Sequence, residues 1–148
     1  MSLILKKVKS IDLYPFRNKV LRNNKWIQYC KFEGDENIDS VHFAAFNYNS
    51  IVGGVSLIKN RTNKIKSLNN IQLRGMGVYE AFQKNKIGTL LIEKVELYCI
   101  KNNIEFIWMN ARLEATGFYL KNGYTKTKKS FNIEGIGEHY FLFKKIKW

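Results

Sequence analysis

The sequence predicts a mixed α/β fold in a single domain spanning residues 1–148. Three observations lead to this expectation. Segments of strand length with alternating or continuous apolar residues recur along the chain. A polar loop near the middle opens a helix that has apolar residues on one face. Strand pairs flank this central unit, and the expected order of elements is β-αα-βββ-α-β-α-ββ, a length and layout that suit one compact domain.

The residue pattern in the N-terminal part of the chain predicts one strand and one or two helices. Residues 3–10 ("LILKKVKS") have the length of a short strand. Residues 14–32 have helical patterning, and Pro15 suits a first helical turn, where no N–H donor is needed. The segment 33–40 ("EGDENIDS") is an acidic, turn-rich loop.

Three strands are expected next. Residues 41–60 fit a hairpin that turns at Asn49–Ser50. After a polar connection, residues 71–80 ("IQLRGMGVYE") alternate as a strand does, with glycines at 75 and 77. Glycines inside a strand indicate either a structural bulge or a place where another group approaches the backbone. The two interpretations are compatible.

The second half predicts two helices and three strands. A helix is expected over residues 88–102, since one face of it collects Leu91, Val95, Tyr98 and Cys99. Residues 105–111 have the apolar character of a buried strand. Residues 113–123 fit a short helix that ends at Gly123. Two further strands, around the turn "EGIGE", complete the chain.

The net charge is strongly positive. The formal value is +13, from 25 Lys and Arg against 12 Asp and Glu, and the pI is about 9.8. This balance favours polyanionic partners: nucleic acid, an anionic membrane, or a small ligand with several phosphates. A general bias toward Lys, Asn and Ile codons explains the charge equally well, so charge alone does not choose among them.

Several classes of protein are not expected. Cys30 and Cys99 are too few and too isolated for a disulfide framework or a zinc site, and no metal is expected. The start of the chain does not have the pattern of a signal peptide. No segment approaches the roughly 18 apolar residues of a membrane-spanning helix. We therefore expect a cytoplasmic protein with no membrane partner.

The polar loop at residues 83–88 is a candidate anion site. A helix start presents unpaired backbone N–H groups at the positive end of the helix dipole, and Lys84 and Lys86 add charge. The glycine patterns of a nucleotide P-loop and of a dinucleotide fingerprint are both absent. The alternative is the lysine-rich start of an ordinary surface helix.

Five segments, in this order, resemble the GNAT family of acetyl-CoA-dependent N-acetyltransferases. They also resemble a bacterial subgroup of it with "LRGMAV", "CNAR..A..FY.K.GF" and "GIGPHY" segments. The matching segments are "FEGDENIDSVHFAAF" (32–46), "LRGMGV" (73–78), "FQKNKIGTLL" (82–91), "NARLEATGFYLKNGY" (110–124) and "IEGIGEHYFLFKK" (133–145). The resemblance implies a mostly antiparallel sheet of about seven strands flanked by about four helices, splayed centrally to hold acetyl-CoA. It also implies direct transfer of an acetyl group to a primary amine.

The resemblance assigns the polar loop to the pyrophosphate of coenzyme A. Gln83 and Gly88 match the ends of the family signature Q/R-x-x-G-x-G/A, and Ile87 fills its apolar slot. Lys86 stands where the family has its first glycine, a residue that tolerates positive φ. Lys86 is expected either to hold an ordinary φ with its side chain turned outward or to direct its ammonium at the phosphates. The cofactor-binding residues expected here are Gln83, Lys84, Asn85, Lys86, Ile87, Gly88 and Thr89.

The resemblance also assigns residues to the thioester end of the cofactor. The backbone of Met76, Gly77 and Val78 would bind the pantetheine arm, and the Met76 N–H would polarise the thioester carbonyl. Asn110 would contact the pantetheine amides. Tyr119 matches the tyrosine that protonates the departing thiolate in many family members, although it could simply pack the short helix on the sheet.

Other roles stay open at this point. The candidate general bases are Glu33, Asp35, His42 and His139, and water could relay the proton instead. The acidic loop could attract a cationic amine. Arg112 has no assigned role, and both cysteines are expected to be structural.

Two alternative functions remain. A basic nucleic-acid-binding module would use the basic and aromatic residues of 124–131 and 139–148. A GNAT-fold protein could also bind coenzyme A without catalysis. The expected partner is a small-molecule or peptide amine rather than nucleic acid, and the expected state is a monomer or homodimer.

Overall fold

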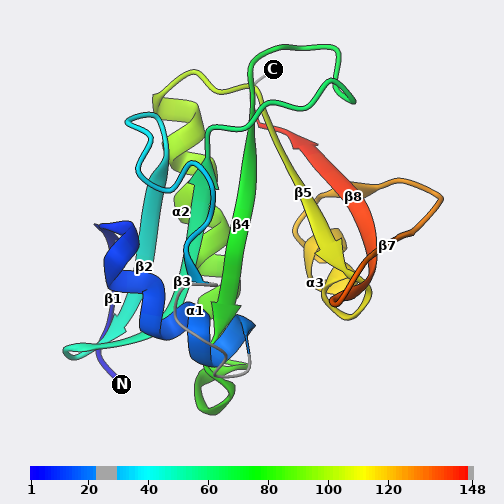
Figure 1. The fold of residues 1–148 in the computed structure, drawn as a ribbon. Helices are drawn as coiled ribbons and strands as arrows, with labels where there is room; N and C mark the ends of the chain where they lie inside the picture. The colour runs from blue at the N-terminus through cyan, green and yellow to red at the C-terminus, as the bar shows by residue number, and fades with distance from the viewer. Residues whose placement is uncertain (23–29, 147–148) are drawn as a thin grey trace.

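The computed structural model describes residues 1–22 and 30–146, and its central feature is one eight-stranded sheet (Figure 1). The strands run in the order β1-β2-β3-β4-β5-β8-β6, and β7 pairs with β8. Their bounds are β1 Leu3–Val8, β2 Val41–Asn47, β3 Ser50–Ile58, β4 Asn70–Val78, β5 Phe106–Arg112, β6 Thr125–Lys126, β7 Phe131–Ile133 and β8 Gly137–Lys145. The α-helices are α1 Tyr14–Leu21, α2 Ile87–Lys101 and α3 Thr116–Lys121.

The sheet confirms the predicted mixed α/β class. All its strand pairs are antiparallel except β4–β5, which is parallel. The described ranges contain three α-helices instead of the expected four, plus 3₁₀ turns at Ser10–Leu13, Glu80–Phe82 and Leu113–Ala115. In the predicted helical region 14–32, α1 ends at Leu21, residues 23–29 lie outside the described residues, and Lys31 and Phe32 are not helical.

Helices α1 and α2 cover opposite faces of the sheet (Figure 1). Two neighbouring glycines of β3 demonstrate this, since successive residues of a strand point to opposite faces. A Cβ on Gly53 would lie 3.2 Å from the Leu91 side chain of α2, whereas one on Gly54 would lie 3.1 Å from the Phe16 ring of α1. On the predicted apolar face of α2, Leu91, Val95 and Cys99 are fully inaccessible to solvent, and Tyr98 is half-buried against the core.

The two central strands separate after a short parallel contact. β4 and β5 are paired only where residues 70–72 face residues 106–108. Beyond that point, within residues 1–22 and 30–146, β3 is the only strand bonded to β4, and β8 is the only strand bonded to β5. The central splay that the resemblance implied is therefore present, and it leaves one edge of β4 without a strand partner among the described residues.

Two details of the strands differ from the expectation. The hairpin turns at Tyr48–Asn49 rather than at Asn49–Ser50, with Tyr48 at φ 55°. The strand expected after Gly123 is divided into β6 and β7. The chain advances five residues from Lys126 to Phe131, whereas the positions in β8 that pair with these two residues are only three residues apart. The surplus residues cannot join the ladder, so they interrupt the strand.

The described part of the chain contains no helix that is long and apolar enough to cross a membrane. Nor do residues 1–22 and 30–146 contain a group of three or more potential metal ligands from His, Cys, Asp and Glu side chains.

The aromatic residues of the C-terminal segment contribute to packing. The Phe141 ring is 4% exposed and stacks on Trp108 with ring centroids 5.7 Å apart. Ile65 joins them in a small core cluster. Phe141 is therefore buried in this cluster. It is one of the rings that the nucleic-acid-binding alternative would need.

Candidate active site

The start of α2 presents unpaired backbone donors. Leu90 donates the first intrahelical hydrogen bond, from its N–H to the Lys86 carbonyl at 3.0 Å. The N–H groups of Ile87, Gly88 and Thr89 have no acceptor within the helix, and no side chain caps this end. The buried Ile87 side chain anchors the turn in the core. These donors can therefore receive an anion at the positive end of the helix dipole.

The loop before α2 is shaped by two lysines in the left-handed region. Lys84 has φ 70° and Lys86 has φ 61°, while Asn85 between them does not have a positive φ. Alternating handedness of this kind brings successive N–H groups to one concave side. The expectation that Lys86 could hold an ordinary φ is wrong, because it keeps the left-handed geometry that glycine usually supplies at this position.

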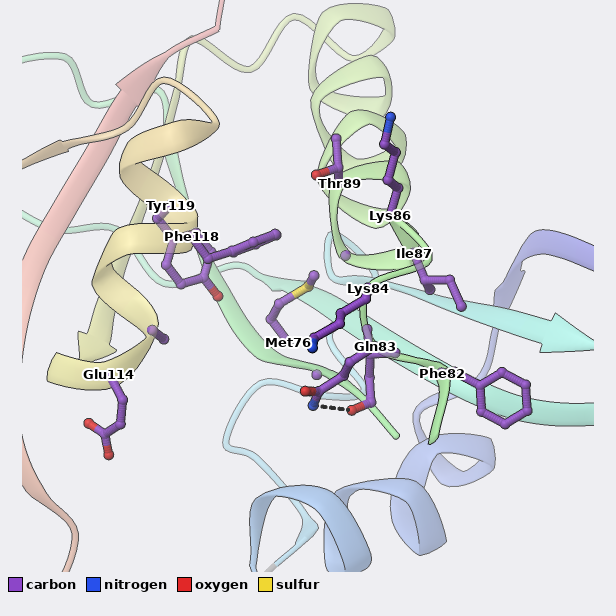
Figure 2. Close-up of a pocket in the computed structure, with 14 residues that line it drawn as sticks. Met76, Phe82, Gln83, Lys84, Lys86, Ile87, Thr89, Glu114, Phe118 and Tyr119 are labelled. Carbon is purple, nitrogen blue, oxygen red and sulfur yellow. Dashed lines mark hydrogen bonds between the residues drawn. The ribbon is translucent and has the colours of Figure 1, made fainter. Parts of the chain in front are cut away.

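The two lysine side chains leave the loop in different directions. Figure 2 shows Lys86 running up beside α2, whereas Lys84 turns toward Met76 and Gln83. Both ammonium groups are solvent-exposed. Of the two, Lys84 thus lies closer to the space between α2 and α3.

A cavity of about 570 Å³ lies between this loop, β4 and α3 (Figure 2). Most of the predicted site residues line it: Met76, Gly77, Val78, Gln83, Lys84, Lys86, Ile87, Gly88, Thr89 and Tyr119. Two predicted site residues do not line it. The Asn85 side-chain amide donates to the Phe82 carbonyl within the loop. Asn110 lines a second cavity. Sequence reasoning assigned no site role to four further lining residues, although all of them lie in the quoted segments 82–91 and 110–124: Phe82, Glu114, Ala115 and Phe118.

The strand β4 reaches this cavity through a bulge. Gly75 has φ +64°, and the β3–β4 register shifts between Gly54 and Ser56, so an extra residue of β4 is accommodated there. Gly75 therefore has the structural role that paired glycines suggested. Beyond it, the unpaired edge of β4 carries free backbone groups, and the Gln83 side chain donates to the Val78 carbonyl at 3.1 Å.

A second cavity, of about 400 Å³, lies on the other side of β4. It is lined by residues of β5, including Asn110, and by Ile133, Ile136 and His139 from the C-terminal strands and the turn between them. Both cavities share six lining residues: Met76, Gly77, Val78, Gln83, Ala115 and Tyr119. The two spaces thus meet at the β4 edge and Tyr119.

Tyr119 is buried at this junction. It is 6% exposed and contacts the rings of Phe118 and Tyr124 edge-on, at 5.2 and 5.9 Å between centroids. Its hydroxyl makes no hydrogen bond to any described residue. Burial raises the pKa of the Tyr119 phenol far above its usual value. The hydroxyl therefore keeps its proton at neutral pH and has a free donor.

Three of the four candidate bases do not face these cavities. Glu33 is exposed and lines neither cavity. The buried Asp35 carboxylate accepts two hydrogen bonds from the Arg17 guanidinium, at 2.7 and 3.0 Å. His42 donates from Nε2 to the Asp35 carbonyl and accepts at Nδ1 from the Ser56 hydroxyl. Asp35 and His42 are therefore occupied by structural bonds.

His139 has a different environment. It is 4% exposed and lines the second cavity. Its Nδ1 lies 2.8 Å from the Gly137 carbonyl, which can only accept a hydrogen bond, so Nδ1 carries the proton. The neutral ring then has its lone pair on Nε2. Of the four candidates, His139 is the one positioned to accept a proton in a cavity.

Both cysteines are buried and line neither cavity. Burial raises the pKa of the Cys99 thiol to about 12, and burial also raises the pKa of Cys30. A thiol that stays protonated is a poor nucleophile. This agrees with structural roles for Cys30 and Cys99.

Comparison with known proteins gives consistent matches. The family model described as "Acetyltransferase (GNAT) domain" matches residues 15–140. The chain is 28% identical over 143 residues to the Bacillus subtilis (strain 168) protein named "Uncharacterized N-acetyltransferase YitI", covering 97% of this chain and 96% of that protein.

Solved structures of the same fold match nearly the whole chain. A GNAT-family acetyltransferase from Staphylococcus aureus Mu50 has a TM-score of 0.72 at 20% identity, covering 99% of this chain and 100% of that chain. An aminoglycoside 6′-N-acetyltransferase complexed with coenzyme A has a TM-score of 0.74 at 16% identity, covering 98% of each chain. The family match, the splayed sheet and the uncapped start of α2 agree, and the chain belongs to the GNAT acetyltransferases, enzymes that use coenzyme A for acyl transfer.

Proposed function

We propose that this protein transfers an acetyl group directly from acetyl-CoA to a primary amine, with the cofactor in the first cavity and the acceptor in the second. The observation that carries this proposal is the meeting of the two cavities at Met76–Val78 and Tyr119. Two substrates that enter from opposite sides of β4 would come together at that junction. The proximity of bound reactants accounts for much of the rate in group transfer.

The residues present fit the parts of coenzyme A. The unpaired N–H groups at the start of α2 would hold the pyrophosphate, with Lys84 adding a nearby positive charge. The unpaired edge of β4 would hydrogen-bond the pantetheine amides as an added strand does. Acetyl-CoA supplies a thioester, which is an activated acyl group.

Three groups of this chain have proposed roles in the transfer. The Met76 N–H would stabilise negative charge on the carbonyl oxygen. His139 Nε2 would accept the proton from the attacking amine, directly or through water. The Tyr119 hydroxyl would donate its proton to the departing sulfur.

The test combines cofactor binding with turnover. Calorimetric titration should show that coenzyme A binds and that binding weakens when its phosphates are removed. Thiol release from acetyl-CoA should depend on an added primary amine. The Tyr119→Phe variant should lose about 10²-fold in kcat, the scale of general acid catalysis, and should bind coenzyme A nearly as well as the unmodified protein.

Tyr124→Phe is the matched control. Tyr124 is also buried and contacts the Tyr119 ring, but it lines neither cavity and its hydroxyl donates to Glu96. Its loss should affect stability rather than turnover. Equal rates for Tyr119→Phe and the unmodified enzyme would remove Tyr119 from the proposed role, and absence of coenzyme A binding would reject the whole proposal.

A further inference from the structure

We propose that the acceptor is a primary amine that also carries a carboxylate or phosphate, and that Arg22, Arg74 and Arg112 bind this acidic group. This inference rests on the proposed function, because it assigns the second cavity to the acceptor. It makes the acceptor an anionic or zwitterionic molecule rather than a simple cationic amine.

Three arginines from separate elements line the second cavity. Arg22 follows α1, Arg74 lies on β4 and Arg112 ends β5. No aspartate or glutamate is among the described residues that line this cavity. The sequence of residues 23–29, which follows Arg22, contains no acidic residue either. The described lining therefore contains three cationic side chains and no carboxylate.

Stacking on one ring orders two of these side chains. The guanidinium carbon of Arg74 lies 4.2 Å from the centroid of the Phe32 ring, and that of Arg22 lies 5.7 Å from it. Phe32 itself is 7% exposed, so it is a fixed platform. A stacked guanidinium keeps its edge of N–H donors available, and that planar edge matches the geometry of a carboxylate or phosphate.

The hydrogen bonds of Arg74 and Arg112 leave donors available. Within the described residues, Arg74 has no hydrogen-bond or ion-pair partner. Arg112 uses one nitrogen to donate to the Leu21 carbonyl at 3.2 Å, which ties β5 to the end of α1 and leaves its other N–H groups. An acidic ligand would satisfy these donors.

The electrostatics agree with an anion site. Burial lowers the pKa of both Arg22 and Arg74, and repulsion between neighbouring arginines lowers the pKa of each further. The Asp35 and Glu33 carboxylates partly oppose this lowering of the pKa for Arg74. Asp35 is paired with Arg17 and does not line the cavity. Glu33 is exposed and outside the cavity lining.

The arginines also lie on the correct side of the reaction centre. Arg112 and His139 are direct partners in the β5–β8 pairing, so their side chains are on the same face of the sheet. Lys84 and residues 86–89, which lie before and at the start of α2 and would hold the cofactor phosphates, line the first cavity and not the second. A volume of about 400 Å³ suits a small molecule. An acid group on the arginines would leave its amine in the cavity that contains Tyr119 and His139.

The experiment uses amines that differ in their acidic group. L-leucine is compared with L-leucinamide, and O-phosphoethanolamine with ethanolamine, at equal concentrations of unprotonated amine. Thiol release gives kcat/KM for each probe. Calorimetry of the same probes with the coenzyme A-saturated protein gives binding without turnover. At least one acidic member should exceed its neutral partner by about 10- to 100-fold, the scale of hydrogen bonds to a charged group.

Variants test the assignment to the arginines. Arg74→Gln and Arg112→Gln should each reduce the acidic-to-neutral ratio by about ten-fold or more, while Arg74→Lys should retain part of it. Arg61→Gln is the matched control, because Arg61 is exposed and lines neither cavity. The ratio distinguishes recognition from a general loss of folding, which would lower both members equally.

The outcomes separate the two proposals. Neutral amines that bind or react as well as their acidic partners would overturn this inference and leave the acetyl transfer intact. Binding of coenzyme A without binding of either acidic probe at millimolar concentration would also overturn it. An unchanged ratio in the arginine variants would reject the assignment to these side chains. Absence of coenzyme A binding would instead reject the proposed function.

Discussion

Lys86 shows how a single residue can retain a loop geometry without the usual glycine. Its φ of 61° places it in the left-handed region, and Lys84 at 70° is similar. An L-residue in this conformation carries a cost of about 1–2 kcal/mol, because its Cβ approaches the following carbonyl. The anchoring of Ile87 in the core and the first hydrogen bond of α2 hold the loop in place.

Lys84→Gly and Lys86→Gly make a matched pair. Each should change the free energy of unfolding by between zero and about +1 kcal/mol, since relief of strain is partly offset by the flexibility of glycine in the unfolded chain. Only Lys84→Gly should weaken coenzyme A binding, by about two- to five-fold, because only its ammonium turns toward the cavity. Urea unfolding and calorimetry provide the measurements. A larger loss of affinity in Lys86→Gly would show that Lys86 contacts the phosphates.

His139 carries a second prediction at this scale. His139→Gln should lower kcat by about 10²-fold, as expected for loss of a general base, with little change in coenzyme A affinity. Glutamine retains a hydrogen-bonding side chain of similar length but cannot accept the proton. Thiol release and calorimetry measure the two quantities. A kcat equal to that of the unmodified protein would assign the base to another group or to water.

At the scale of elements, the bulge in β4 and the start of α2 together form the proposed cofactor side of the site. Gly75 allows the bulge, because a Cβ there would lie 2.8 Å from the Phe32 ring. Phe32 is also the platform under Arg74. The absence of a side chain at Gly75 therefore allows both the bulge in β4 and the position of the Phe32 ring beside the second cavity.

Gly75→Ala should be strongly destabilising, and Gly135→Ala is its control. Gly135 also has a positive φ, +78°, but an added Cβ would meet no atom within 4 Å. Gly135→Ala should cost about 1 kcal/mol from backbone strain. Gly75→Ala should cost a further 1–3 kcal/mol or so, since overpacking is added. Urea unfolding of both variants gives the difference, and equal losses would exclude the steric contribution.

Sequence reasoning predicted these elements with different success. Periodicity located α2 within a residue because its buried face is formed within one helix. It did not divide β6 from β7, because that division depends on the register against β8. Most of the residues predicted to bind the cofactor lie in contiguous motifs, and they line one cavity. Arg22 and Arg74 were missed, since nothing local marks arginines from different elements as neighbours.

For the whole molecule, a buried polar network connects the N-terminal helix to the sheet. Arg17 on α1 is fully buried and bonds Asp35 as well as Ser56 on β3. Ser56 donates to His42 on β2, and His42 donates back to the Asp35 carbonyl. Within this network, Arg17 Nε is the one buried side-chain atom without a hydrogen-bond partner among the described residues, which matters because an unpaired buried charge is costly.

This network predicts a dependence of stability on pH. Burial, with a further contribution from the Arg17 charge, lowers the pKa of His42 below its usual value of about 6.5. The unfolded chain then binds this proton at a higher pH than the folded protein does. The free energy of unfolding should therefore fall as pH drops below about 6.5, by at most about 1.4 kcal/mol per pH unit for one proton.

Urea unfolding at several pH values between about 7.5 and 5.5 measures this dependence, above the range where most carboxylates titrate. His42→Asn should be less stable at neutral pH and should show a flatter dependence. A stability of the unmodified protein that does not change over this range would contradict the assignment to His42.

The sequence by itself determined the fold class, the position of α2 and the loop that would hold the pyrophosphate. These features depend on residues close together in the chain: a periodic apolar face, a polar turn and paired glycines. Only the tertiary structure decided that Asp35 and His42 are used internally, that His139 faces a cavity and that three arginines converge. Each of these depends on which distant side chains share a desolvated space, and that is fixed by strand order and packing.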